Sequence, residues 1–373
     1  MILLGIAACI AWSVLLLGRG MFWRARDDDR DARWLPEPAH WPLVQVIIPA
    51  RDEAETIGAT VRSLALQDYP GRFHILVVSD RSTDHTAALA RAAGAEVLEG
   101  QGRPPGWSGK LHALQQGLDA VARQHHAFLL FTDADIRHAP DSLRRLVQRA
   151  EAGRLDLVSL MARLRCASAA ERWMIPAFVF FFQMLYPFRW SNDPAARTAA
   201  AAGGCVLLRR AAFEARGGLH PIRGRIIDDC ALAGLMKGGG SRIWIGLTER
   251  VQSLRACEDF STIRAMVART AYAQLGYNPF LLAGMVLAMA LVFLAPPILA
   301  LFATGFAKWL GALAWAAMVL AFTPTLLRFG LAAERGILLP LIAFGFLVFT
   351  LDSALSEWRG RGGFWKGEAL SRE

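Results

Sequence analysis

Cysteine is scarce in this sequence, and its cysteines are not spaced as metal-binding pairs. Five of the 373 residues are cysteine, and none of them forms a Cys-x-x-Cys pair. This usage fits a reducing compartment and argues against a zinc site. The basic residues are scattered along the chain and no nucleic-acid recognition module is found, so we expect no nucleic-acid partner.

Charge and hydropathy indicate a protein of mixed character. Apolar residues make up 54% of the chain, and the mean hydropathy of +0.31 is too high for an ordinary soluble protein but low for a pure membrane bundle. The net charge of +9 suits anionic lipid headgroups or a phosphorylated substrate. At a prior of roughly 150 residues per domain, the length predicts about two domains. We therefore expect a soluble domain joined to membrane helices.

The amino-terminal segment predicts a membrane anchor. Residues 2–18 are uncharged and mostly apolar, and arginines follow them from Arg19 onward. A cleaved signal peptide carries its positive charges before the apolar core, which is the opposite arrangement. We expect residues 1–23 to be an anchor and 24–42 a linker. The basic flank places the amino terminus outside and the next domain in the cytoplasm.

The carboxyl-terminal third contains long apolar runs. Residues 280–356 hold three stretches long enough to span a bilayer, at about 280–303, 309–327 and 337–354. Three spans would put the basic tail at 357–373 outside, against the positive-inside tendency, so the number of spans stays open. Residues 256–279 before them are basic and amphipathic, which favours a segment at the membrane surface.

Residues 43–255 alternate between short apolar runs and helical patterns. This alternation predicts an α/β domain with a mostly parallel sheet covered by helices on both faces. Asp52 is expected to cap the first helix, which would begin at Glu53. The expected strands lie at 44–49, 73–78, 95–98, 127–131, 155–160 and 242–245.

An aromatic segment at 171–190 interrupts this domain. Its two prolines and Gln183 make it a poor spanning helix. We interpret it as a helix at the membrane interface or as part of a lipid-acceptor groove. A buried core helix of the soluble domain is the alternative.

Two aspartates follow an apolar strand at Asp133-Ala134-Asp135. Ligand sites of open α/β sheets lie beyond the carboxyl ends of the strands. Two carboxylates there can share a divalent cation. Waters and phosphate oxygens then complete the coordination shell of the cation. The alternative is that both residues only shape a turn. A second acidic pair, Asp228-Asp229, opens a helix further along the chain.

Four segments together resemble the family 2 glycosyltransferases with the GT-A fold. They are the opening strand and turn at 46–53, the segment 77–84, Asp133-Ala134-Asp135, and the acidic start at 228–232. The resemblance covers residues 43 to about 250. The loop at 106–110, the segments 201–210 and 272–277, and the membrane tail are most similar to the glycosyltransferases associated with hopene and hopanoid biosynthesis.

The resemblance implies a nucleotide-diphosphate sugar as donor. Asp80 would accept hydrogen bonds from the base or ribose, and Pro49, Arg51 and Glu53 would border the base. Glu53 could instead be a first-turn charge that interacts with the helix dipole. Ser79 and Arg81 replace the aspartate and glycine that are usual in the family, so the nucleotide stays undefined.

The same resemblance implies roles at the reacting centre. Lys110 would contact the diphosphate, or be a surface lysine, and Asp133 and Asp135 would hold Mg²⁺ or Mn²⁺. Asp229 would be the general base, with Asp228 orienting it or raising its pKa. The alternative is that Asp228 caps a helix and Asp229 is solvated. Direct inversion at the anomeric carbon is the expected stereochemistry.

The sequence lacks the Gln-x-x-Arg-Trp motif of processive polymer synthases, which favours transfer of one sugar. We therefore predict a membrane-bound inverting glycosyltransferase at the cytoplasmic face of a bacterial inner membrane. Its acceptor would be a lipid, with a hopanoid hydroxyl as the specific choice and a polyprenyl phosphate as the alternative. A sugar-nucleotide pyrophosphorylase would need a glycine-rich first turn, which residues 49–53 do not supply. A non-catalytic membrane scaffold with a degenerate transferase domain stays open.

Overall fold

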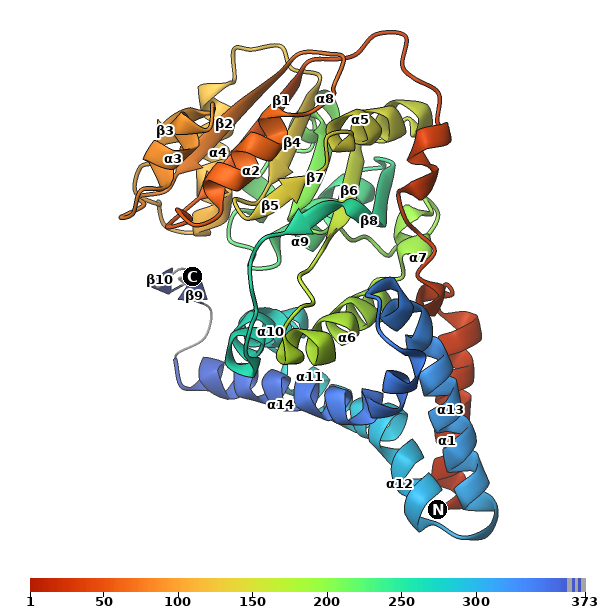
Figure 1. Cartoon of the computed structure of the whole chain (residues 1–373). Helices are drawn as coiled ribbons and strands as arrows, with labels where there is room; N and C mark the ends of the chain where they lie inside the picture. The colour runs from red at the N-terminus through yellow and green to blue at the C-terminus, as the bar shows by residue number, and fades with distance from the viewer. Residues whose placement is uncertain (361–363, 366–367, 370–373) are drawn as a thin grey trace. The chain divides into compact units, whose positions relative to one another are not determined.

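The computed structural model describes residues 1–360, 364–365 and 368–369 (Figure 1). The chain forms two compact units. A sheet unit is built from Arg26–Arg165 and Trp190–Ala256, and a helical unit contains Met1–Ala25, Cys166–Arg189 and Cys257–Phe364. The predicted basic tail at 357–373 falls partly outside the described residues, at 361–363, 366–367 and 370–373.

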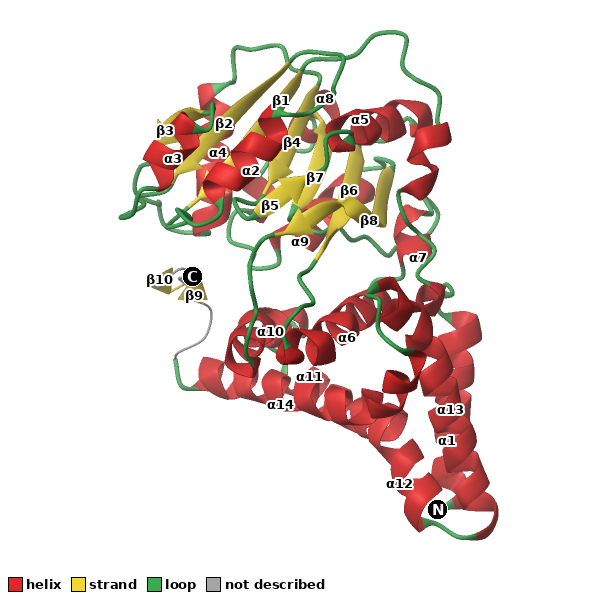
Figure 2. Ribbon diagram, in the orientation of Figure 1, coloured by secondary structure: helices red, strands yellow, loops and turns green. Residues whose placement is uncertain are grey.

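The sheet unit is built on an eight-stranded sheet in the order β3-β2-β1-β4-β7-β6-β8-β5 (Figure 2). Strands β5 and β7 run antiparallel to their neighbours, and the other paired neighbours are parallel. The predicted α/β class with a mostly parallel sheet is confirmed. The strands are β1 (Val44–Ala50), β2 (Phe73–Ser79), β3 (Glu96–Glu99), β4 (Phe128–Thr132), β5 (Ile136–His138), β6 (Leu157–Arg163), β7 (Cys205–Arg209) and β8 (Ile243–Ser253).

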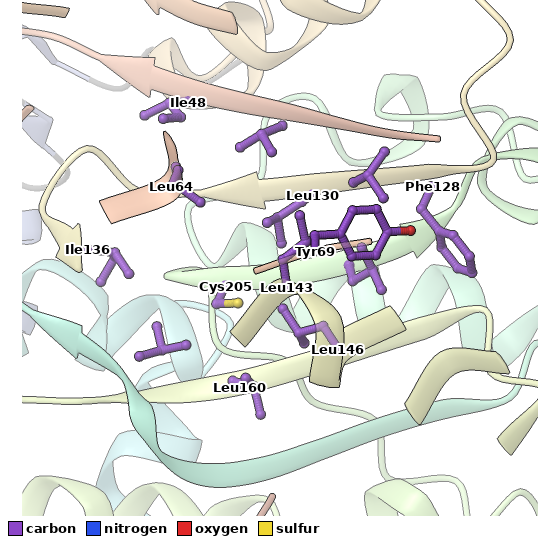
Figure 3. Close-up of a cluster of buried hydrophobic side chains, with 14 of the residues drawn as sticks. Ile48, Leu64, Tyr69, Phe128, Leu130, Ile136, Leu143, Leu146, Leu160 and Cys205 are labelled. Carbon is purple, nitrogen blue, oxygen red and sulfur yellow. The ribbon is translucent and has the colours of Figure 1, made fainter. Parts of the chain in front are cut away.

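Helices cover both faces of this sheet because its central strands are apolar on both sides. Every residue of β1 and of β4 is buried, as expected of inner strands in a parallel sheet. One face packs on α2 (Ile57–Ala65) and α5 (Ser142–Gly153), through the buried cluster of Figure 3. The other face packs on α4 (Gly109–Ala120) and α9 (Asp228–Gly238). Two shorter helices, α3 (Thr86–Ala92) and α8 (Arg210–Glu214), complete the cover.

Close packing fixes α4 against the sheet. A Cβ atom on Gly117 would lie 2.7 Å from Ile47 Cγ2 and 3.0 Å from Val78 Cγ2, so no larger side chain fits there. Ser108 precedes the helix, and its hydroxyl accepts a hydrogen bond from the Leu111 backbone N–H. The start of α4, which carries Lys110, is therefore held at a fixed position beside the strands.

Three local predictions need correction. Asp52 does not cap a helix: its φ is +50°, its carboxylate accepts hydrogen bonds from Thr83, and α2 begins only at Ile57. The turn at 52–56 is held by side-chain contacts from Thr86 and Asp84 and by backbone hydrogen bonds from Thr56 and Ile57 to the Glu53 carbonyl. Strand β5 was not predicted, and β8 extends eight residues beyond the predicted end at 245. The extra length of β8 pairs with β5, directly after Asp135.

The helical unit packs around one large buried cluster. Ala8, Trp12, Phe180 and Phe322 are among its most buried members. The helices of the unit are α1 (Ile2–Ser13, continued to Gly18), α6 (Ala169–Leu185), α10 (Phe260–Gln274), α11 (Pro279–Met289), α12 (Ala295–Phe302), α13 (Gly305–Arg328) and α14 (Leu339–Trp358), with the short α7 (Phe188–Asn192) at its boundary. Two small buried clusters lie beside α10–α11 and α12–α13.

The aromatic segment forms α6, a helix of this unit. Phe180 packs on Phe322 of α13, and Phe181 packs on Phe346 of α14. The alternative of a core helix in the sheet domain is wrong, because these partners all belong to the helical unit. A place at the membrane interface or in an acceptor groove stays a prediction. The helix passes through Pro176 and begins with a capping box of Ser168 and Glu171.

Among the described residues, three helices are long and apolar enough to cross a membrane. They are Pro279–Phe302, Gly305–Arg328 and Ala333–Trp358, close to the predicted ranges. The amino-terminal apolar helix, Ile2–Gly18, is shorter than the predicted anchor at 1–23. The linker at 24–42 belongs mostly to the sheet unit, where the buried Asp29 accepts a hydrogen bond from Thr248.

Candidate active site

The predicted acidic residues gather at one edge of the sheet. Asp80 follows β2, and Asp133 and Asp135 follow β4, so both groups lie at the carboxyl ends of parallel strands. Asp228 and Asp229 form the first turn of α9. The side chain of Lys110, from the start of α4, brings the last two groups together.

Lys110 is the centre of this arrangement. Its Nζ lies 2.8 Å from Asp133 Oδ1 and 3.4 Å from Asp228 Oδ2. Burial alone would lower the pKa of Lys110, but the two carboxylates outweigh it and raise that pKa. Burial raises the pKa of Asp133, and the positive charge of Lys110 opposes this increase. The alternative of a surface lysine is therefore wrong, whereas contact with a diphosphate stays a prediction.

Asp229 is held by backbone donors. Its Oδ2 accepts a hydrogen bond of 2.9 Å from the Gly203 N–H, and its Oδ1 accepts one of 2.7 Å from Cys230 N–H. Burial and the neighbouring Asp228 raise the pKa of Asp229 to about 6. A carboxyl group with this pKa, fixed in orientation and able to accept one more proton, has the properties of a general base.

Gly203 packs closely against the charged side chains of Lys110 and Asp229. A Cβ atom there would lie 3.0 Å from Lys110 Nζ and 3.4 Å from Asp229 Oδ2. The glycine lets the main chain approach both side chains at once. The alternative of a merely solvated Asp229 is wrong, because the aspartate makes these specific backbone contacts.

Asp135 is paired with a cation that the sequence analysis did not single out. Arg255, just after β8, places Nε 2.8 Å from Asp135 Oδ2 and Nη2 2.6 Å from Glu53 Oε1. Glu53 lies outside α2, which begins at Ile57, so the alternative of a first-turn helix charge is wrong. Its predicted place beside a nucleotide base stays a prediction.

Asp80 is the most deeply buried of the predicted site residues. It is 1% exposed, and neither carboxylate oxygen has a hydrogen-bond partner among the described residues. Arg51 Nη1 lies 3.8 Å from Oδ2, and Arg81 Nε lies 3.5 Å from Oδ1. Two arginines thus offset the charge of a carboxylate whose oxygens are left without a close donor, which is compatible with a polar ligand at this position.

Pro49 lies inside the sheet rather than on its surface. It is buried in β1 opposite Val78 of β2, beyond the last paired residue of β4. A proline has no N–H to donate, so it is tolerated where one neighbouring strand has ended. Whether Pro49 also borders a base stays a prediction.

The residues present fit a divalent cation that the substrate helps to hold. No group of three or more His, Cys, Asp or Glu side chains among the described residues could hold a metal by itself. Asp133 and Asp135 supply hard carboxylate oxygens, which Mg²⁺ and Mn²⁺ prefer. Mg²⁺ is commonly bound through one or two carboxylates together with substrate phosphates, so a two-aspartate site agrees with this chemistry.

Three features of the site escaped sequence reasoning. Nothing marks Arg255 among the 41 lysines and arginines, because its partners lie 120 and 202 residues away. The small residues around Gly203 were a visible signal, but its role depends on Asp229. His138 is fully enclosed and shares a 2.9 Å hydrogen bond with Thr132, at the end of β4. Burial lowers the pKa of His138 to about 4, so it is neutral near pH 7.

Comparison with known proteins supports the reading of the sheet unit. Residues 45–217 match the model of the family described as glycosyl transferase family 2. A 4,4'-diaponeurosporenoate glycosyltransferase of Staphylococcus aureus (strain MRSA252) is 39% identical over 92 residues, which are 24% of this chain and 23% of that protein. The same enzyme of strain USA300 matches to the same extent. The match thus spans less than a quarter of the curated relatives.

One solved structure is similar over nearly the whole chain. It is the mannosyltransferase PcManGT from Pyrobaculum calidifontis in complex with GDP-Man and Mn²⁺, with a TM-score of 0.56 and 21% identity. The alignment covers 96% of this chain and 99% of that one. At this identity the likeness shows a shared GT-A-like fold. The family match is confined to residues 45–217, most of which lie in the sheet unit.

Proposed function

We propose that this protein is a membrane-bound, metal-dependent glycosyltransferase that moves one sugar from a nucleotide-diphosphate sugar to a hydroxyl group of a lipid. The observation that carries the proposal is the contact set of Lys110 with Asp133 and Asp228, beside an Asp229 held by backbone donors. Such a transfer requires a cation, a pair of carboxylates that can hold a metal, and a base.

The chemistry of the proposed step follows from these residues. Asp229 accepts the proton of the acceptor hydroxyl as its oxygen forms a bond to the anomeric carbon. The bond from that carbon to the diphosphate breaks, and its electron pair stays on the diphosphate oxygen. Lys110 offsets part of the charge that develops there. Mg²⁺ or Mn²⁺ at Asp133 and Asp135, when bound, supplies Lewis-acid stabilisation of the same leaving group. Attack opposite the leaving group inverts the anomeric configuration.

The donor end of the proposed site is Asp80, with Pro49, Arg51 and Glu53 near the base. The buried Asp80 carboxylate lacks a hydrogen-bond partner among the described residues, which supports a role in binding a ribose or base. The two arginines beside it would lie close to the donor's own charges.

The proposed base at Asp229 favours a hydroxyl acceptor over a phosphate acceptor. A polyprenyl phosphate is already ionised near pH 7 and needs no base, whereas an alcohol must lose its proton as it attacks. The three long apolar helices support delivery of this acceptor from a membrane. A hopanoid side-chain hydroxyl is the specific acceptor that we propose, at the cytoplasmic face of a bacterial inner membrane.

The test is transfer of a labelled sugar in isolated membranes. Membranes that contain the protein are incubated with labelled nucleotide sugars and Mn²⁺, and the lipid fraction is counted. We expect one donor to label a lipid, and we expect chelation or the Asp135→Ala variant to abolish the signal. Full transfer by Asp135→Ala would refute the site. Calorimetry without any metal-dependent nucleotide binding would favour a non-catalytic scaffold instead.

A further inference from the structure

Arg255 occupies a place that no part of the proposed reaction requires. It lies in the last residues of the sheet unit, where the Leu254 N–H donates a 2.7 Å hydrogen bond to the Asp135 carbonyl. The main chain at 254 is therefore tied to the same aspartate whose carboxylate the Arg255 side chain holds. This double attachment makes the contact a built feature of the site rather than a chance surface pair.

The guanidinium neutralises a crowded group of carboxylates. Asp133 and Asp135 are two residues apart directly after β4, and each carboxylate is ion-paired with a cation. Lys110 offsets the first carboxylate, and Arg255 offsets the second while also binding Glu53. The Arg255 side chain is 49% exposed, so it can leave this position for solvent, whereas Asp135 is 8% exposed and cannot.

We propose that Arg255 and the divalent cation compete for Asp135, so that Arg255 acts as a positioning residue that holds the carboxylate when no metal is bound. This inference rests on the proposed function, because it takes Asp133 and Asp135 as the metal-binding pair. A cation held by Asp133 and Asp135 would need the Asp135 carboxylate that Arg255 Nε now contacts. Glu53 retains the displaced guanidinium nearby through its own ion pair.

Competition and a purely structural role predict opposite changes in metal affinity when Arg255 is removed. An arginine that only supported the loop would weaken metal binding when removed, because Asp135 would become less ordered. If the arginine competes with the metal, its removal would strengthen metal binding, since this frees one carboxylate oxygen and removes a unit of positive charge near the divalent ion. At a partly exposed site this charge change corresponds to about tenfold in the dissociation constant.

The experiment measures Mn²⁺ binding to the purified full-length protein in detergent by electron paramagnetic resonance, without nucleotide. We expect Arg255→Gln to bind Mn²⁺ about tenfold more tightly than the unaltered protein, and Arg255→Lys to show a smaller gain because it keeps the charge. Thermal unfolding with and without Mn²⁺ gives a second readout: the stabilisation by Mn²⁺ should be larger for Arg255→Gln.

Two controls isolate the mechanism. Arg91→Gln removes a cation from an exposed ion pair with Glu99, far along the sheet edge, and should leave Mn²⁺ affinity unchanged. Adding Asp135→Asn to Arg255→Gln should abolish the gain, because the effect acts through Asp135. Unchanged or weaker Mn²⁺ binding by Arg255→Gln would overturn the competition. If sugar transfer still required metal in that variant, the proposed function would stand; if no variant bound Mn²⁺, both proposals would fail.

Discussion

At the scale of single residues, the site depends on a few contacts between distant parts of the chain. Lys110, Asp133 and Asp228 meet although more than 90 residues separate Asp133 from Asp228. The two carboxylates of the acidic pair differ in their surroundings. Asp228 pairs with Lys110, whereas Asp229 is bonded to backbone N–H groups and has a raised pKa. This difference supports the separate roles that we propose for two neighbouring and chemically identical side chains.

Replacing Asp229 should remove the base and leave the fold intact. Asp229→Asn keeps the size of the side chain but cannot take a proton, so kcat should fall by about 10²–10⁴. Donor KM should change little, because the donor contacts proposed for Asp80 and Lys110 remain. Steady-state kinetics with a saturating lipid acceptor measures both constants. Asp119→Asn, on the exposed side of α4, is the matched control, and a variant at Asp229 with normal kcat would refute the assignment.

The raised pKa of Asp229 gives the reaction a pH dependence. The base works when deprotonated, and its pKa is about 6 rather than near 4. As pH falls through 6 the carboxylate is protonated, so kcat/KM should decline about tenfold per unit below that value and be flat above it. A pH–rate profile measured in constant salt tests this expectation. An acid limb near pH 4 would show that the responsible group has an ordinary carboxyl pKa.

At the scale of elements, α9 links the base to the loop before β7. Asp229 lies in the first turn of this helix, and Lys237 in its last turn donates hydrogen bonds to three backbone carbonyls, those of Trp190, Ser191 and Thr198. Gly203 lies a few residues after Thr198, and its backbone N–H donates a hydrogen bond to Asp229. One helix thus holds both ends of the segment that positions the base.

Removing the Lys237 ammonium should loosen this segment. Lys237→Met keeps the aliphatic stem but leaves carbonyls without a donor, so the sheet unit should lose about 1–3 kcal/mol. The variant should unfold at a lower temperature and transfer sugar more slowly, because Gly203 is less well placed. Differential scanning calorimetry and the transfer assay measure the two effects. Arg123→Met, an exposed cation beyond α4, should change neither; a Lys237→Met variant as stable as the unaltered protein would contradict this role.

At the scale of the whole molecule, α1 is part of the helical unit's core as well as an apolar end segment. Trp12 is 1% exposed, its Nε1 donates a 2.8 Å hydrogen bond to the Val292 carbonyl, and its ring packs edge-on against Phe293. Three other helices are long enough to span a bilayer by themselves. Membrane attachment and the stability of the helical unit should therefore respond differently to loss of α1.

Deletion of residues 2–18 should leave the protein in the membrane and destabilise it. The three long helices should resist extraction by alkaline carbonate, whereas the lost packing around Trp12 should lower the melting temperature in detergent by several degrees. Fractionation and thermal unfolding measure the two properties. Release of the shortened protein into the soluble fraction would show that α1 is the principal anchor.

Much of this architecture could be predicted from local sequence. The buried strands β1 and β4 are apolar runs that end in polar residues. The common location of the acidic groups after β2 and β4 could be predicted because the carboxyl ends of parallel strands lie at the same edge of a sheet. The turn at Asp52 and the length of β8 could not be predicted, because side-chain contacts and pairing with β5 decide them. Arg255 could not be found for the same reason: its partners are brought to it only by the folded sheet.

The most direct test of the account is the lipid content of cells with and without this protein. Lipid extracts from a deletion strain, and from the same strain supplied with the unaltered chain or with Asp229→Asn, are compared by mass spectrometry. The account predicts one lipid class heavier by a single sugar only when the unaltered chain is present, with the sugar-free lipid accumulating in the other two. Identical lipid profiles in all three strains, or full restoration by Asp229→Asn, would contradict it.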